Sequence, residues 1–286
     1  MAHDALGTRM KELYENRSKT FLTRRTPVII RLDGKAFHTF TRGFRRPCDR
    51  ILHEAMESTM RYLCENIQGC KIGYTQSDEI TLLVTDWDTL ETNAWFDYNV
   101  QKICSIAASM ATLEFNRSLA KLVMDEERSW NHGLTPQSLE IQMEHSQYIS
   151  NLENAVAKGA MFDARAFNIP KEEVVNCFIW RQQDAIRNAI QMLGQTYFSH
   201  KELQGKNCTE IVDMLINQKR IYINNMPATF QRGCCCFKIS YPHVTVDAKT
   251  KEEVVTRRTK WTIDEEIPVF TEDRSYIGRY VNECED

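Results

Sequence analysis

Two short acidic motifs near the start of the chain contain residue types that suit metal-assisted phosphoryl transfer. Asp33 and Gly34 follow an apolar run, and Ser77, Asp78 and Glu79 separate two further apolar runs. Carboxylate oxygens are ligands that Mg²⁺ prefers, and Mg²⁺ takes substrate phosphates among its remaining ligands. Two such ions can activate an attacking hydroxyl and neutralise a leaving pyrophosphate. We therefore predict that Asp33 and Asp78 are direct metal ligands.

The residues that follow Asp33 suit a bound triphosphate. Because Gly34 has no side chain, its carbonyl and the neighbouring amides can approach a metal or a triphosphate closely. Lys35 and His38 come directly afterwards as potential phosphate partners. Each motif also has a simpler interpretation, since Asp-Gly is common in turns and Ser-Asp-Glu can be the polar tip of a hairpin. The functional interpretation therefore depends on whether the two motifs meet in the fold.

The elements around the two motifs predict that they do meet. Runs of apolar and β-branched residues indicate strands, and apolar residues at helical spacing indicate helices. The expected elements are a helix at 4–14, a strand at 28–33, a helix at 49–68, strands at 71–75 and 80–85, a helix at 95–115, a strand at 161–169 and a helix at 172–197. This order matches the ferredoxin-like unit, whose first two strands are parallel with the third between them. Asp33 should then lie beside the turn that contains Asp78.

Outside this core the sequence predicts helical additions and a C-terminal extension. The polar stretch at 125–150 looks irregular or inserted, and a pair of strands is expected around 235–239 and 254–259. We therefore predict an α+β protein with a ferredoxin-like βαββαβ core. Residues 1–215 are expected to form the catalytic domain with its helical extension, and residues 216–286 to pack on it.

The composition is that of an ordinary globular protein. The 286 residues are 42% hydrophobic and 26% charged, which suits one large domain or a core domain with an appendage. The N-terminus lacks the continuous apolar segment of a signal peptide, and no later stretch is apolar enough to span a bilayer. We therefore expect a cytoplasmic protein with no membrane partner.

The ten cysteines are expected to be free thiols, because a chain without an export signal stays in a reducing compartment. Cys234, Cys235 and Cys236 are consecutive, which differs from the C-x-x-C spacing of a zinc site. We expect them to be buried thiols rather than metal ligands.

Charge is close to balanced over the whole chain but not locally. The formal net charge is −3, so a role in nucleic-acid binding would have to depend on local patches. The stretch 17–50 holds ten basic and two acidic residues, a local balance of +8. It is either a solvated basic surface or a phosphate-binding face.

Five sequence blocks resemble those of the tRNA-His guanylyltransferase family, in the same order. The blocks are R-L-D-G-K-A-F-H at 31–38, G-Y-T-Q-S-D-E at 73–79, F-D-A-R at 162–165, W-R-Q-Q-D at 180–184 and F-S-H-K-E-L-Q-G-K at 198–206. The resemblance as a whole runs from about residue 5 to residue 215. The resemblance implies a polymerase-palm-like domain that extends RNA in the 3′-to-5′ direction. In this reaction ATP or GTP first activates a 5′-monophosphate, and the 3′-hydroxyl of an incoming nucleotide then displaces the activating group.

The resemblance also implies site residues, cofactors and partners. The catalytic set is Asp33, Asp78 and Glu79, and two Mg²⁺ ions are held by Asp33, the Gly34 carbonyl and Asp78. The nucleotide-binding set is Asp33, Gly34, Lys35, Ala36, Phe37, His38, Arg46, Ser77, Asp78 and Asn188. The last of these, Asn188, could equally well hydrogen-bond to a neighbouring helix. The substrates are GTP, ATP and other nucleoside triphosphates together with tRNA, and the family resemblance further implies a homotetramer.

Two departures from the eukaryotic family pattern refine this expectation. Residues 186–189 read I-R-N-A where those enzymes carry H-I-N-N, so the chain resembles the bacterial and archaeal guanylyltransferase-like branch. That branch implies template-dependent repair of truncated tRNA 5′ ends, with non-templated G addition to tRNA-His as the alternative. The family's K-P-N-D block is R-P-C-D here, and Arg46 keeps the charge with a different donor geometry.

The basic residues of the later blocks suit phosphate contacts to RNA, although ordinary ion pairs would explain them equally well. They are Arg165, Arg181, Lys201 and Lys206. Trp180 is expected to be a core anchor rather than a platform for base stacking.

Three other functions use the same residues. A cyclic-dinucleotide synthase or a primer-extending polymerase also needs two acids and Mg²⁺, but the basic stretch favours a large RNA substrate. A non-catalytic RNA-binding protein is disfavoured, because unpaired acids beside RNA would repel phosphate in the absence of a metal.

Overall fold

The computed structural model describes residues 4–132, 138–246 and 253–282, which build one antiparallel sheet in the order β4-β1-β3-β2-β5-β6. The strands are β1 (Val28–Gly34), β2 (Cys70–Gln76), β3 (Glu79–Val84), β4 (Phe162–Asn168), β5 (Cys234–Val246) and β6 (Glu253–Asp264). Every neighbouring pair is antiparallel, so β1 and β2 run parallel with β3 between them. The expected ferredoxin-like core is confirmed.

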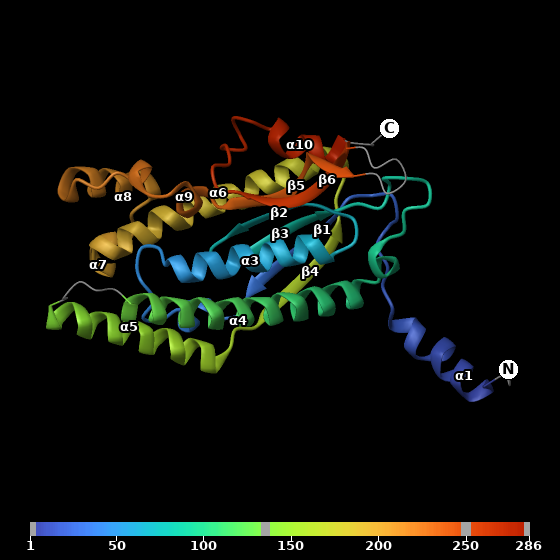
Figure 1. Ribbon diagram of the computed structural model, residues 1–286, viewed down its shortest axis with the longest axis horizontal. Coiled ribbons are helices and arrows are strands. Elements are labelled where there is room, and N and C mark those ends of the chain that lie inside the picture. Colours follow the sequence, from blue (N-terminus) through green and yellow to red (C-terminus); the bar gives the residue numbers. More distant parts are fainter. Residues whose placement is uncertain (1–3, 133–137, 247–252, 283–286) are drawn as a thin grey trace.

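Helices cover both faces of this sheet (Figure 1). One face packs against α3 (Arg50–Asn66) and α4 (Val100–His132), and the other packs against α6 (Lys171–Tyr197) and α10 (Ser275–Asn282). The first half of β1 is apolar on both faces, as expected for a strand between two helical layers. Its alternate residues point to opposite sides: Ile30 packs on the side of α3 and α4, whereas Ile29 packs on the side of α6.

The segment expected to be irregular is helical. Helix α4 continues to His132, and α5 (Leu139–Lys158) packs beside it; part of the connection, 133–137, lies outside the described residues. The prediction failed because α5 is mostly polar and has only a narrow apolar stripe, in which Tyr148, Ile149 and Leu152 are buried. The predicted start of α4 at Trp95 is too early: the backbone is left-handed at Phe96, Asp97 and Tyr98, so the helix begins only at Val100.

A small lobe of short helices and turns lies beyond the C-terminal end of α6. Its core consists of Leu193, Phe198, Ile211 and Leu215. The short elements of the chain are η1 (Glu15–Ser18), α2 (Phe37–Phe40), η2 (Trp95–Tyr98), α7 (His200–Leu203), α8 (Cys208–Met214), η3 (Leu215–Lys219), η4 (Ile223–Asn225) and α9 (Ala228–Arg232).

The C-terminal strands complete the sheet rather than form a separate layer. Strand β5 pairs with β2 from Thr75–Cys234 to Ile72–Phe237, and β6 pairs with β5 along its whole length. This strand pair is expected from the sequence, although it is longer than predicted. At the other end of the chain, α1 (Ala5–Leu13) projects from the body and buries none of its residues (Figure 1). None of the described helices combines the length and apolar composition needed to cross a bilayer.

Candidate active site

The two acidic motifs meet at one end of the sheet. The amide of Gly34, the last residue of β1, donates a hydrogen bond to the carbonyl of Asp78 at 3.1 Å. In the pairing of β1 with its two neighbouring strands, Asp33 lies opposite Glu79 on β3 and opposite Asp163 on β4. The predicted juxtaposition of Asp33 and Asp78 is therefore confirmed, and a further carboxylate is brought to the same end.

The environment of Asp78 is costly for a negative charge. Burial raises the pKa of this carboxyl to about 6, and the charges of Asp33 and Glu79 act in the same direction. The hydroxyl of Ser77 opposes the rise in pKa by donating to Asp78 Oδ1 at 3.0 Å. A divalent cation would offset both the burial and the repulsion, so this carboxylate has the properties of a metal ligand.

Glu79 has the opposite environment, because two arginines neutralise it. Its Oε2 lies 3.2 Å from an Arg181 nitrogen and 3.4 Å from an Arg31 nitrogen. Arg181 also pairs with Asp184 on the next turn of α6. Glu79 is therefore held by guanidinium groups and is less available than Asp78 as a direct metal ligand.

The turn after Asp33 presents free backbone amides. A Cβ atom at Gly34 would lie only 2.3 Å from the ring of Phe37, so no larger residue is accommodated without movement. Ala36 has left-handed backbone with φ +54°. Among the described residues, the amides of Ala36, Phe37 and His38 donate to no acceptor, and the side chains of Lys35 and His38 are exposed. This turn can donate hydrogen bonds to phosphate oxygens.

Two other residues predicted to bind nucleotide, Arg46 and Asn188, lie outside the two acidic motifs. Arg46 lies on the segment that leads into α3, and Asn188 lies on α6. Both are exposed, and within the described part of the chain neither hydrogen-bonds to the acidic residues. Their part in nucleotide binding therefore stays a prediction.

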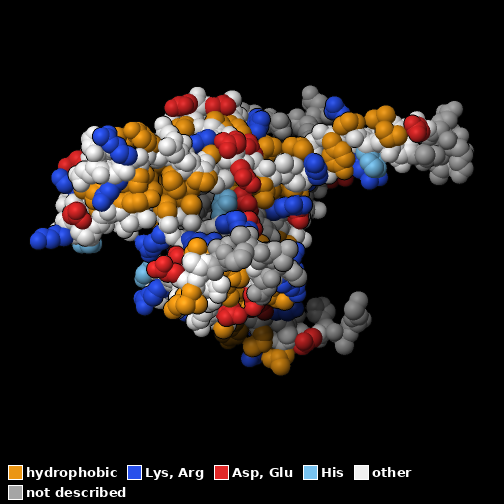
Figure 2. Space-filling model, turned by 60° about the vertical axis from the view of Figure 1, so that its left-hand side comes forward, with side chains coloured by type: hydrophobic (Ala, Val, Ile, Leu, Met, Phe, Trp, Pro, Cys, Tyr) orange, Lys and Arg blue, Asp and Glu red, His pale blue; other side chains and the backbone are white. Residues whose placement is uncertain are grey.

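The four residues predicted to bind RNA differ in their exposure. Arg181 is only 4% exposed and is occupied by its two carboxylate partners, so the prediction of an RNA contact for it is corrected. Arg165 is exposed and lies 3.5 Å from Asp163, and Lys206 lies 3.2 Å from Glu210. Lys201 is exposed on α7. On the face drawn in Figure 2, basic and acidic side chains are interspersed, so no field of one sign marks an RNA path there.

At this end of the sheet, Asp163 was missed and Trp180 was misjudged by sequence reasoning. Asp163 lies in the F-D-A-R block, two positions before Arg165 on the same strand, and this spacing was the available signal. Trp180 is 47% exposed, so the expectation of a core anchor is wrong. The guanidinium carbons of Arg31 and Arg181 lie 4.9 Å and 4.3 Å from the centroid of its ring, within the range of cation–π contacts.

Solved structures of a bacterial relative share this fold over nearly the whole chain. A bacterial tRNA(His) guanylyltransferase-like protein in complex with ATP matches with a TM-score of 0.76 and 37% identity. The match covers 98% of this chain and 100% of that chain. The same kind of protein in complex with GTP matches with a TM-score of 0.72, 36% identity and the same coverage.

Sequence comparisons give the same family. An uncharacterised protein of Acanthamoeba polyphaga mimivirus is 28% identical, covering 79% of this chain and 74% of its own length. A probable tRNA(His) guanylyltransferase of Dictyostelium discoideum is 22% identical, covering 86% of each chain. The sequence model described as tRNAHis guanylyltransferase matches residues 7–170. The chain thus belongs to the tRNAHis guanylyltransferase family and is, as a member of it, a nucleotidyltransferase.

Proposed function

We propose that this protein repairs truncated tRNAs by template-dependent addition of nucleotides to the 5′ end, in the 3′-to-5′ direction. The observation that carries this proposal is the meeting of Asp33 and Asp78 beside a turn with free amides. Relatives that bind ATP and GTP support a nucleotide substrate. The 37% identity with the bacterial guanylyltransferase-like protein, against 22% with the Dictyostelium protein, supports the repair branch.

The reaction would proceed in two phosphoryl transfers. The 5′-phosphate of the tRNA attacks the α-phosphorus of ATP or GTP, and pyrophosphate leaves. The 3′-hydroxyl of the incoming nucleotide then attacks the activated 5′-phosphorus, and the nucleoside monophosphate leaves. Both steps need charge neutralisation at phosphate oxygens, which positioned cations and amides provide.

The donors at the acidic end fit Mg²⁺. Asp33, Asp78 and the Gly34 carbonyl offer only oxygen atoms, which are the ligands that this ion takes. The raised pKa of Asp78 supports this proposal, because a bound cation would offset the cost of burying its negative charge. When bound there, two Mg²⁺ ions would lower the pKa of the attacking hydroxyl and neutralise the leaving group.

The remaining residues would bind and orient the substrates. The amides after Gly34, together with Lys35, His38 and Ser77, are proposed to hold the triphosphate. Arg46 and Asn188 are proposed as further nucleotide contacts, because both are exposed. We propose that Arg165, Lys201 and Lys206 contact RNA phosphates, and that Arg181 positions Glu79 instead.

Non-templated addition of G to tRNA-His is the second candidate function. It is favoured by the Dictyostelium relative, which is described as a probable tRNA(His) guanylyltransferase. The I-R-N-A segment at 186–189 argues against it, because it lacks the His and one of the asparagines of the eukaryotic block.

We further propose a cytoplasmic homotetramer built on a catalytic part, 1–215, and an extension, 216–286. The division is supported by the position of the first four strands, all of which lie in the catalytic part. The extension contributes β5 and β6 to the same sheet, so it is proposed to act as a structural completion of the palm.

The deciding experiment supplies purified protein with Mg²⁺ and labelled nucleotides. The substrates are tRNAs lacking their first nucleotide, each with a different base at the opposing template position. We expect addition of the complementary nucleotide in every case, and loss of addition in Asp33→Asn and Asp78→Asn. The matched control is Asp213→Asn, which removes an exposed carboxylate from α8.

Other results of this experiment would support a different function. Addition of G whatever the template base would support the second candidate, and a cyclic product from GTP alone would support a cyclase. Activity that survives in both folded active-site variants would show that these acids do not carry the reaction.

A further inference from the structure

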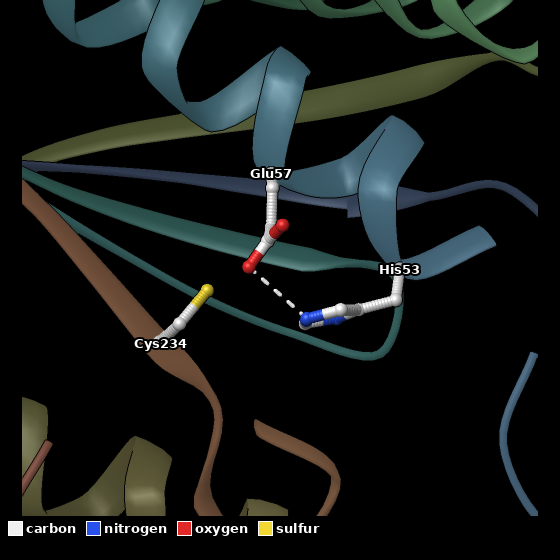
Figure 3. Close-up of side chains that lie close together, drawn as sticks. All are labelled: His53, Glu57 and Cys234. Atoms are coloured by element: carbon white, nitrogen blue, oxygen red, sulfur yellow. Dashed lines mark ion pairs between the residues drawn. The ribbon is translucent and has the colours of Figure 1, made fainter. Parts of the chain in front are cut away.

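A second group of potential metal ligands lies near the same end of the sheet as the acidic motifs, but on the opposite face, which α3 covers. It consists of His53 and Glu57 on α3 and Cys234 on β5, whose side chains point toward one another (Figure 3). His53 Nε2 lies 3.0 Å from Glu57 Oε1, and one ligand atom from each of the three residues lies within 4.8 Å of the others. The group uses none of the residues proposed for catalysis or substrate binding.

The sequence explains why these three side chains converge. His53 and Glu57 are four residues apart, so they lie on the same face of α3, one turn from each other. In β5 the side chains alternate, so Cys234 and Cys236 face α3, whereas Cys235 faces α6. Three consecutive cysteines thus deliver only one thiol to the group, at the first residue of the strand.

The polar atoms of the group lack conventional partners. Glu57 is 8% exposed, Cys234 is fully buried, and the atom His53 Nε2 is itself buried. Apart from facing each other, His53 Nε2 and Glu57 Oε1 have no hydrogen-bond partner among the described residues. Buried polar atoms are nearly always satisfied, so an unsatisfied pair beside a thiol calls for an explanation.

A metal ion would satisfy all three groups. One imidazole nitrogen, one carboxylate oxygen and one thiolate form a mixed donor set that suits Zn²⁺ and does not suit Mg²⁺. Zinc bonds to these atoms are roughly 2.0–2.3 Å long, so ligand atoms in a tetrahedral site lie on the order of 3–4 Å apart. The observed separations need only a small closure to reach this geometry.

We propose that His53, Glu57 and Cys234 bind one Zn²⁺ ion that ties α3 to the start of β5. The imidazole side chain is 34% exposed, so water can reach the remaining coordination position. The ion would sit at the junction between the catalytic core and the C-terminal strands. It differs from the proposed Mg²⁺ site in ligand chemistry and lies across the thickness of the sheet from it.

A hydrogen bond from the thiol to the carboxylate is the competing explanation. Burial and the nearby charge of Glu57 raise the pKa of the Cys234 thiol well above its usual range, so the metal-free thiol is protonated. Such a thiol can donate to Glu57 without any ion. The experiment must therefore detect a metal–thiolate bond directly.

The full-length protein, stripped with a chelator and dialysed, is titrated with Zn²⁺ and separately with Co²⁺ as a spectroscopic probe. We expect one Zn²⁺ per chain and a thiolate-to-cobalt charge-transfer band, which carboxylates at the Mg²⁺ site cannot produce.

Cys234→Ala should abolish the band and weaken zinc binding on the order of 100-fold, since each ligand carries a share of the total affinity. His53→Gln changes a partly exposed side chain and should weaken zinc binding while the fold is retained. Cys236→Ala, which removes a buried thiol from the same face of β5, should keep both the band and the stoichiometry.

Several results would overturn the proposal. They are absence of the band in the wild type, a band that persists in Cys234→Ala, and zinc binding that is lost only in an Asp33→Asn, Asp78→Asn double variant. If Cys234→Ala does not fold by circular dichroism, unchanged zinc affinity in folded His53→Gln would still refute the site.

Discussion

Asp78 and Glu79 are adjacent in sequence but have opposite electrostatic environments. Asp78 has other carboxylates as neighbours, and burial raises its pKa to about 6. Glu79 instead lies between Arg31 and Arg181. Substitutions at the two positions should therefore have different consequences for stability and for metal binding.

We expect Asp78→Asn to stabilise the metal-free protein at neutral pH. The folded pKa is raised above the unfolded value, so the wild type gains stability from this carboxyl at pH below about 4 and loses it as the pH rises through about 6. The variant has no charge to bury, so at pH 7 it should be more stable by about 1–3 kcal/mol. Urea unfolding with chelator present, at pH 4 and pH 7, measures the difference. The prediction fails if the advantage of the variant is the same at both pH values.

Arg181→Met should be much more disruptive than Arg187→Met, although both arginines pair with Asp184. Arg181 is buried and also holds Glu79, so its loss leaves uncompensated carboxylates and should cost about 3–5 kcal/mol. The Arg187 side chain is 55% exposed, so its loss should cost roughly 1 kcal/mol or less. Urea unfolding of both variants makes the comparison, and equal losses would contradict it.

At the residue scale, the sequence predicted which motifs lie close together better than it predicted which side chains form ion pairs. Asp33 and Asp78 could be placed together because strand order and parallel direction follow from local patterns. The pair between Arg181 and Glu79 could not, because it joins residues about a hundred positions apart through side-chain packing. The burial of Arg181 and the exposure of Trp180 depend on how α6 rotates against the sheet, which periodicity leaves open.

At the element scale, the beginning of α3 is fixed by one buried carboxylate. Asp49 accepts from the amide of Leu52 at 3.1 Å as the helix cap, and from the amide of Arg45 at 2.8 Å. It also accepts from the hydroxyl of Tyr148 on α5 at 2.9 Å. Asp49 thus links a helix cap to the packing of a second helix.

We expect Asp49→Ala to lower the free energy of unfolding by about 2–4 kcal/mol, because it removes the cap and leaves a buried hydroxyl unpaired. Tyr148→Phe removes only one of these bonds and should cost roughly 1 kcal/mol. The loss of stability in the double variant should be smaller than the sum of the two single losses, because both single substitutions remove the same hydrogen bond between Tyr148 and Asp49. Chemical denaturation of the three variants tests this, and strict additivity would rule out the coupling.

The elements themselves were predicted unevenly from the sequence. Strands β1 to β4 and helices α3 and α6 were found because their apolar residues are dense and their ends carry Pro, Gly or Asp signals. Helix α5 was missed because its buried residues are few and are separated by polar ones. Only the structure identifies this segment as a helix, because its narrow apolar stripe packs against α4.

At the scale of the whole molecule, the two ends of the chain differ in their importance for folding. Helix α1 buries no residue, so removing residues 1–14 should leave the melting temperature nearly unchanged. Ending the chain at residue 232 would strip β5 from the edge of β2 and remove Ile277 and Phe270 from the core beneath α6. This shorter chain should aggregate or remain unfolded. Thermal melting and size-exclusion chromatography of both truncations check the contrast, and a soluble, folded 1–232 fragment would contradict it.

The pairing of β2 with β5 also sets the order of events during translation. About 160 residues separate the end of β2 from the start of β5, so at cellular rates of synthesis the ribosome needs roughly 8 to 30 seconds to deliver the partner strand. Throughout that interval the N–H and C=O groups along one edge of β2 have no native partner, and such an edge can pair with other chains. We therefore expect chaperone protection during this interval to raise the yield of folded protein.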